Sequence, residues 1–303
     1  MSVTRQRWHA AMALPSMRFL SMRNGGRGST GADVTDKARL KRLGDGTLIA
    51  YASAGGGSPV VCVHGALCDF RYWEPQLRGL ADRHEVLAPS LAHYHPPLPD
   101  TQLPAFGWRQ HAQQVLDFIQ ACGLDRAHLV GHSRGAAVAW QAAIAQPQRV
   151  RSLTLLDPGA PQEAGLPAEA EALRAQALAL LDAGEQDAGL ACFVDSVSQP
   201  GSWKRSSEAF RNMVRDNAAT LAPQLADALP PFRQADARAL ELPVLLLDGA
   251  LSPAQYRDNA AALSAWLPDA RRHTIAGASH GMTFTHPRRC NALIGQFLAE
   301  HEG

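Results

Sequence analysis

A glycine-flanked serine is the residue best suited to nucleophilic chemistry. Ser133 stands at the centre of a Gly-x-Ser-x-Gly motif at residues 131–135, after an apolar run and before a run of small residues. A sharp strand-to-helix turn crowds the backbone, so the two glycines supply positions without a β-carbon and the serine hydroxyl points outward. A helix beginning at Arg134 would direct backbone N–H groups at any oxygen bound there. The motif predicts a nucleophilic serine.

Strand and helix signals alternate along most of the chain. Residues 38–51 alternate apolar and polar residues around an Asp-Gly turn, which predicts a β-hairpin. Further strands are expected at 59–65, 84–89, 128–131, 151–156, 242–249 and 272–275, separated by helical patterns. This alternation of strands and helices predicts an α/β fold with a mostly parallel central sheet and helices on both faces.

The alternation stops between Gly159 and Pro231, where the apolar spacing is helical. We therefore expect an all-helical cap inserted after the sixth core strand, across the carboxyl edge of the sheet. The predicted organisation has four segments, which are a leader and flexible linker at 1–36, the first part of the α/β core at 37–158, the cap at 159–231 and the second part of the core at 232–303.

Three motifs occur in a meaningful order, namely His64-Gly65 after a central strand, the Ser133 motif, and the glycine-rich Gly277–Gly281 near the end. With them the chain from Lys37 onward resembles an α/β-hydrolase of the serine esterase and lactonase-like branch. The resemblance implies that Ser133 attacks, that His280 is the general base, and that an acid orients and stabilises the imidazole. It also implies an oxyanion hole.

The two oxyanion donors implied by the resemblance are the backbone N–H groups of Ala66 and Arg134. The acid departs from the common pattern, because the loop after the strand at 242–249 has a serine where most relatives have aspartate. A minority of the family places the acid at the end of the preceding core strand, which Asp157 matches. We favour Asp157 over Asp248, whose side chain would still belong to a strand, although a turn-capping role for Asp157 stays open.

The loop at Leu91–Pro97 also departs from the family and contains a His-x-His pair. Without a third ligand we favour a loop shaped by its prolines, and we expect neither a metal ion nor a cofactor. Apolar side chains that are candidates for lining the substrate pocket are Phe70, Trp73, Phe193, Trp203, Met213 and Met282.

The amino-acid composition narrows the classes of molecule that this protein is expected to bind. Hydrophobic residues make up 46% of the chain and charged residues 19%, and 29 Lys and Arg stand against 28 Asp and Glu. This balance argues against nucleic acid or an anionic membrane as the main partner. No apolar run approaches the length of a membrane span. Five cysteines without a C-x-x-C pair favour reduced thiols and a cytoplasmic protein.

The residues and the resemblance together predict a cofactor-free serine hydrolase that cleaves a carboxylic ester or lactone of a hydrophobic small molecule through an acyl-enzyme. A lactone-specific hydrolase is the first alternative. A lyase or perhydrolase with the same triad, and a ligand-binding receptor of hydrolase fold, are further alternatives. The sequence leaves the substrate open, and it leaves open whether the chain forms a homodimer.

Overall fold

The computed structural model of this chain describes residues 38–98, 103–161 and 165–302. The predicted leader and linker at 1–36 lies outside the described residues. Across the described ranges, no helix is both long enough and apolar enough to cross a membrane.

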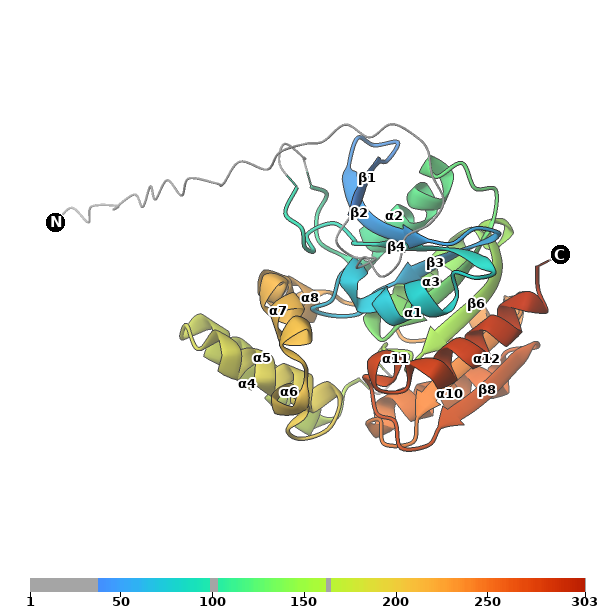
Figure 1. Cartoon of the computed structure of the whole chain (residues 1–303). Coiled ribbons are helices and arrows are strands. Elements are labelled where there is room, and N and C mark those ends of the chain that lie inside the picture. Colours follow the sequence, from blue (N-terminus) through green and yellow to red (C-terminus); the bar gives the residue numbers. More distant parts are fainter. Residues whose placement is uncertain (1–37, 99–102, 162–164, 303) are drawn as a thin grey trace. The chain divides into compact units, whose positions relative to one another are not determined.

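An eight-stranded sheet organises the chain (Figure 1), in the order β1-β2-β4-β3-β5-β6-β7-β8. β2 pairs antiparallel with β1 and β4, and the remaining pairs are parallel. The predicted mostly parallel sheet is confirmed. The strands are β1 (Arg39–Arg42), β2 (Leu48–Ala54), β3 (Ser58–Val63), β4 (His84–Pro89), β5 (Ala127–His132), β6 (Val150–Leu156), β7 (Val244–Gly249) and β8 (Ala270–Ile275).

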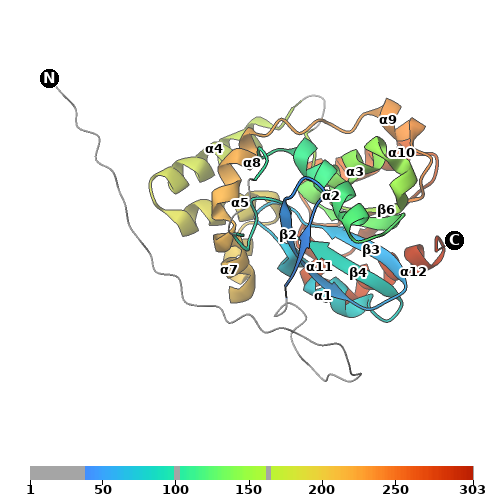
Figure 2. The ribbon, with the colours of Figure 1, turned by 90° about the horizontal axis from the view of Figure 1, so that it is seen from above.

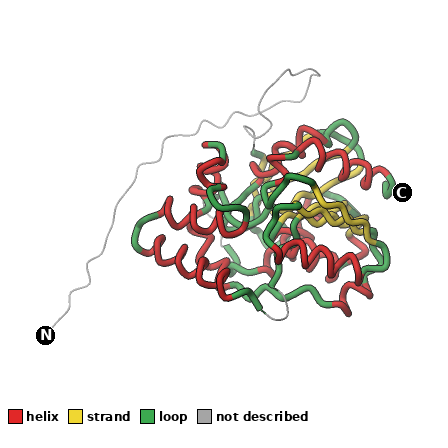
Figure 3. The backbone as a smooth tube through the Cα atoms, turned by 90° about the horizontal axis from the view of Figure 1, so that it is seen from below, coloured by secondary structure: helices red, strands yellow, loops and turns green. Residues whose placement is uncertain are grey.

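Helices cover both faces of the sheet, and Figure 3 shows the strands between two groups of helices. One apolar cluster contains residues of α2, α3, α9 and α10, and the opposite cluster contains residues of α1 and α12. The bounds are α1 (Glu74–Gly79), α2 (Trp108–Ala121), α3 (Arg134–Ala145), α9 (Gln234–Ala239), α10 (Ala254–Trp266), α11 (Met282–Thr285) and α12 (Pro287–Ala299), with 3-10 turns at Phe70–Trp73 and Pro147–Arg149.

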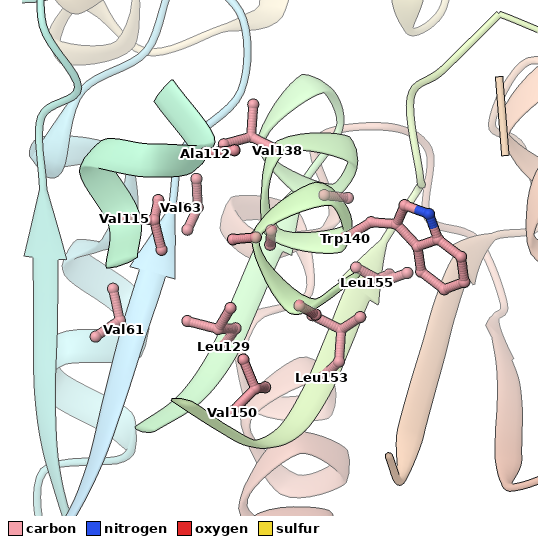
Figure 4. Packing of buried hydrophobic residues seen from close by; sticks show 14 of the residues in the cluster. Val61, Val63, Ala112, Val115, Leu129, Val138, Trp140, Val150, Leu153 and Leu155 are labelled. Atoms are coloured by element: carbon pink, nitrogen blue, oxygen red, sulfur yellow. The ribbon is translucent and has the colours of Figure 1, made fainter. Parts of the chain in front are cut away.

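The central strands are apolar on both sides because each side meets helices. In β3, Val61 and Val63 belong to one apolar cluster while Val60 and Cys62 belong to the other, as the alternation of strand side chains requires. Figure 4 shows the first cluster from close by, with the indole of Trp140 beside the sheet. The continuous apolar runs in the sequence therefore mark strands buried on both faces.

The helical insertion expected after β6 is present, and Figure 2 shows its helices grouped together. We call residues 165–231 the helical insert. Its helices are α4 (Ala168–Asp182), α5 (Gln186–Val197), α6 (Ser202–Arg205), α7 (Glu208–Asp216) and α8 (Leu221–Ala226), with a 3-10 turn at Ala218–Thr220. Phe193, Val194 and Val214 form its own small core, which also includes Leu67 from the loop after β3. The insert therefore packs against that loop.

Buried polar contacts hold the end of α7 to the same loop. Asp69 is fully buried, and its carboxylate accepts hydrogen bonds from Arg71 (2.6 Å) and from the Asn217 side chain (2.7 Å). Arg71 also donates to Asp216 at 2.8 Å. Because a buried carboxylate is stable only when it is paired and hydrogen-bonded, these contacts fix the end of α7 to the loop after β3.

Burial of neutral histidines makes the fold sensitive to acid. His128 on β5 lies between the hydroxyls of Ser152 (2.7 Å) and Ser58 (3.2 Å), and burial lowers its pKa to about 4. Between that value and the unfolded pKa of about 6.5, only the unfolded chain takes up the proton, so stability falls as the pH falls.

We predict that, between pH 7 and pH 5, the unfolding free energy of the wild type falls by about 2 kcal/mol more than that of His128→Asn. Urea unfolding of wild type and variant at both pH values measures this difference. His273 on β8 is exposed, so His273→Asn is the control and should leave the pH dependence unchanged. Equal pH dependence in all three proteins would contradict the prediction.

Candidate active site

Ser133 lies at a tight turn between β5 and α3, with a φ of 54° and a ψ of −124°. The flanking glycines are required by close backbone approach. A β-carbon at Gly135 would lie 2.2 Å from the carbonyl oxygen of Val63, and one at Gly131 would lie 2.5 Å from the carbonyl oxygen of Gly135. A positive φ in a residue other than glycine costs free energy and persists only where the surroundings impose it.

Asp157 follows β6 directly, is fully buried, and has its carboxylate in contact with His280. The Nδ1 of His280 lies 2.9 Å from Oδ2 of Asp157. The same carboxylate accepts hydrogen bonds from the Ser252 hydroxyl (2.6 Å) and the Gly249 backbone N–H (3.2 Å). Because Asp157 accepts from Nδ1–H, the Nε2 of His280 is left free to accept a proton.

Asp248, the alternative acid, has different partners. Its carboxylate accepts hydrogen bonds from Arg272 (2.8 Å) and from the hydroxyl of Thr274 (3.1 Å), both on the neighbouring strand β8. Asp248 on β7 therefore forms an ion pair with Arg272 on β8. Of the two aspartates, Asp157 is the one that contacts His280.

Ser133 and His280 both line a cavity of about 820 Å³. Ala66 and Arg134, the residues expected to supply oxyanion donors, line it as well. Of the six apolar residues considered from the sequence, Phe193 lines the cavity. The other five are not among its lining residues and pack in the apolar clusters, namely Phe70, Trp73, Trp203, Met213 and Met282.

The loop after β3 is held by His64, which is neutral. Its Nε2 accepts the backbone N–H of Leu91 at 3.0 Å, so the proton is on Nδ1, which donates to the carbonyl oxygen of Gly65 at 2.9 Å. Burial lowers the pKa of His64 to about 4, which keeps the ring uncharged at neutral pH. A β-carbon at Gly65 would lie 3.1 Å from the β-carbon of Ser133, so the backbone before Ala66 runs beside the nucleophile turn.

Two aromatic contacts of His280 were not predicted from the sequence. The ring of Tyr256 stacks on its imidazole, with centroids 4.2 Å apart and planes 24° apart. Tyr256 and Ser133 both line the cavity, and burial raises the pKa of the Tyr256 hydroxyl to about 12. On another side, Nε2 of His132 lies 2.8 Å from the backbone carbonyl oxygen of His280. Burial lowers the pKa of His132, so the neutral ring donates this bond.

Arg134 extends its side chain toward the end of the helical insert. Its guanidinium is buried, donates to Asp227 at 2.6 Å, and lies over the ring of Phe106. Asp227 follows α8. The residue next to Ser133 is therefore bound to the insert by a buried ion pair.

The His-x-His pair does not converge on a common centre. Nε2 of His93 lies 2.7 Å from the carbonyl oxygen of Pro104, and His95 is held through its backbone N–H by Asn217 at 2.7 Å. Within the ranges the structure describes, no three His, Cys, Asp or Glu side chains gather as a metal site would require.

Comparison with known sequences identifies the family. Residues 60–293 match the alpha/beta hydrolase family. The chain belongs to this family. It is 28% identical to a 2-hydroxymuconate semialdehyde hydrolase of Pseudomonas sp. strain CF600 over 82% of the chain and 89% of that protein. It is 25% identical to esterase YbfF of Escherichia coli K12 over 80% of the chain and 93% of that protein.

Another relative shares only part of its length with this chain. The dihydrolipoyllysine-residue acetyltransferase component of the acetoin cleaving system of Cupriavidus necator is 39% identical, over 38% of the chain and 30% of that protein. The chain therefore spans less than a third of that protein, and the shared part does not extend its activity to this chain.

Solved structures share the fold. A hydrolase from Pseudomonas aeruginosa PA01 is similar with a TM-score of 0.71 and 20% identity, over 87% of the chain and 99% of that structure. Naproxen esterase from Bacillus subtilis has a TM-score of 0.66 and 20% identity, over 86% of the chain and 91% of that structure. At these identities the likeness concerns the fold alone.

The crowding at the nucleophile turn gives a stability prediction. Gly135→Ala should lower the unfolding free energy by about 3 kcal/mol or more, because its β-carbon would meet two backbone carbonyl oxygens that cannot move independently of β3. Thermal unfolding measures the loss. Gly281→Ala is the control, because a β-carbon there meets no atom within 4 Å. Equal stability of the two variants would refute the argument.

Proposed function

We propose that this alpha/beta hydrolase is a serine hydrolase that cleaves a carboxylic ester or a lactone of a small molecule through an acyl-enzyme. The observation that carries the proposal is the hydrogen bond between Nδ1 of His280 and buried Asp157, because His280 lines the same cavity as Ser133. Serine hydrolases of unrelated folds share this arrangement, in which an acid is hydrogen-bonded to the histidine base and the base takes the proton of the serine nucleophile.

In the proposed mechanism, the hydroxyl of Ser133 attacks the ester carbonyl while its proton passes to Nε2 of His280. Asp157 stabilises the imidazolium that forms. The negative charge that develops on the carbonyl oxygen is bound by the backbone N–H groups of Ala66 and Arg134. The imidazolium then protonates the leaving alkoxide, and a water molecule activated by His280 hydrolyses the acyl-enzyme.

The lining of the cavity supports a substrate with an apolar part. The helical insert contributes Phe193, Val194, Val197, Phe210 and Val214 to that lining. We propose that the segment 159–231 acts as a cap over the core formed by 37–158 and 232–303. The cytoplasmic location and a homodimer stay predictions from the sequence.

A second candidate is hydrolysis of a compound such as 2-hydroxymuconate semialdehyde. It is favoured by the likeness to the Pseudomonas enzyme of that name, which extends over 82% of this chain. The esterase proposal rests in turn on the serine-centred site and on the likeness to esterase YbfF.

Turnover of 4-nitrophenyl esters, small lactones and 2-hydroxymuconate semialdehyde by purified variants tests the proposal. Ser133→Ala and Asp157→Asn should lower kcat by about a thousandfold or more on the preferred substrate, because each removes one member of a unit that acts together. Asp248→Asn should stay within a few-fold of wild type, since Asp248 pairs with Arg272 rather than His280.

Wild-type activity that survives Ser133→Ala would overturn the nucleophile assignment. A larger loss in Asp248→Asn than in Asp157→Asn would overturn the acid assignment. Preference for lactones, or for the semialdehyde, would identify which of the candidate substrates the site accepts.

A further inference from the structure

An arginine without a partner faces the cavity that contains Ser133. Arg174 lies on α4 of the helical insert, is half-buried, and lines this cavity. Within the described part of the chain, its guanidinium has no hydrogen bond and no ion pair. The other two arginines of the lining differ, because Arg134 pairs with Asp227 and Arg205 donates to the carbonyl oxygen of Pro200.

Arg174 shares the cavity with the proposed reaction centre. Ser133, His280 and Tyr256 line that cavity as well, and the ring of Tyr256 stacks on the imidazole of His280. A group bound to the guanidinium would therefore lie in the same cavity as Ser133. Glu171, about one turn earlier on α4, is exposed and attracts Arg174 without forming an ion pair.

The partial burial of this unpaired guanidinium favours the binding of an anion. Burial lowers the pKa of Arg174, because part of its hydration is lost and no carboxylate replaces it. A buried or partly buried charge is unfavourable unless it is paired and hydrogen-bonded. The planar guanidinium fork matches a carboxylate in shape and can donate two parallel hydrogen bonds to it. Arg205 also lacks a carboxylate partner but is exposed to solvent, so the half-buried Arg174 is the guanidinium that would gain most from one negative charge.

We propose that the substrate carries a carboxylate group, and that Arg174 binds this group beside the scissile bond. The inference rests on the proposed hydrolytic function and specifies its substrate class, which is a monoanionic ester or lactone whose remaining part is apolar. Arg174 is then a specificity-determining residue supplied by the insert.

Two pairs of esters matched in skeleton test the proposal. On the acyl side, mono-4-nitrophenyl adipate is compared with 4-nitrophenyl hexanoate. On the alcohol side, 4-(butanoyloxy)benzoate is compared with phenyl butanoate. For at least one pair, Arg174→Gln should lower kcat/KM of the anionic ester by about 10- to 100-fold, the range expected for a charge-assisted hydrogen bond. The neutral ester should change by less than about threefold, well below that range.

Arg205→Gln is the matched control, since it removes the charge of another arginine in the lining, which is exposed and donates to the carbonyl oxygen of Pro200. It should leave both anionic-to-neutral ratios unchanged. The proposal is overturned if Arg174→Gln changes anionic and neutral esters equally in both pairs. It is also overturned if Arg205→Gln changes the ratios as much as Arg174→Gln does.

A binding measurement separates this inference from the proposed hydrolysis. Isothermal titration of monomethyl adipate and of benzoate into Ser133→Ala, and into Ser133→Ala with Arg174→Gln, needs no turnover. At least one probe should bind about tenfold or more weakly when Arg174 is absent, which corresponds to the loss of one charge-assisted contact. Equal affinities, or no binding to Ser133→Ala, would overturn the carboxylate site. A wild type that hydrolyses none of the esters yet binds a probe through Arg174 would overturn the proposed function alone.

Discussion

The buried carboxylate of Asp157 is the constraint on which the site depends. It is fully removed from solvent, and it accepts hydrogen bonds from the end of β7 at Gly249, from Ser252 in the next loop, and from His280 after β8. A buried negative charge without such partners would be strongly unfavourable, so the charge holds these three segments together. The positive φ of 41° at Asp157 is a backbone strain that these contacts offset. The fold and the proposed chemistry therefore share one interaction.

Local signals in the sequence predicted much of the fold. The strand β7 is buried along its whole length and begins with four apolar residues without alternation, so it can be recognised without knowledge of the neighbours. The turn at Ser133 could be predicted for a related reason. A β-carbon at Gly131 would collide with the start of α3, and one at Gly135 would collide with the backbone at the end of β3, so both positions require glycine and the motif is visible in the sequence itself. Signals of this kind depend on the residue and its immediate neighbours.

The rest of the site depends on contacts between distant segments. Asp157 and Asp248 both stand at the end of an apolar run, and only the paired strands show that Asp248 is bound to Arg272 on β8. Ser252 lies in the loop where the resemblance led us to expect an acid, and its hydroxyl donates to Asp157, which follows β6. Tyr256 and Arg174 lie in helices of ordinary composition, so their relation to Ser133 arises only once α10 and α4 meet at the cavity.

The ion pair between Arg134 and Asp227 bears on how this protein can be re-engineered. Exchange of helical inserts between family members is an attractive way to graft one substrate preference onto another core. In this chain Arg134, the residue beside Ser133, has its guanidinium bound to the insert. An exchanged insert without a carboxylate at that point would leave a buried cation without its counter-charge, immediately next to Ser133. The core and the insert therefore depend on each other through this ion pair. A functional chimera must transfer residues 134 and 227 together.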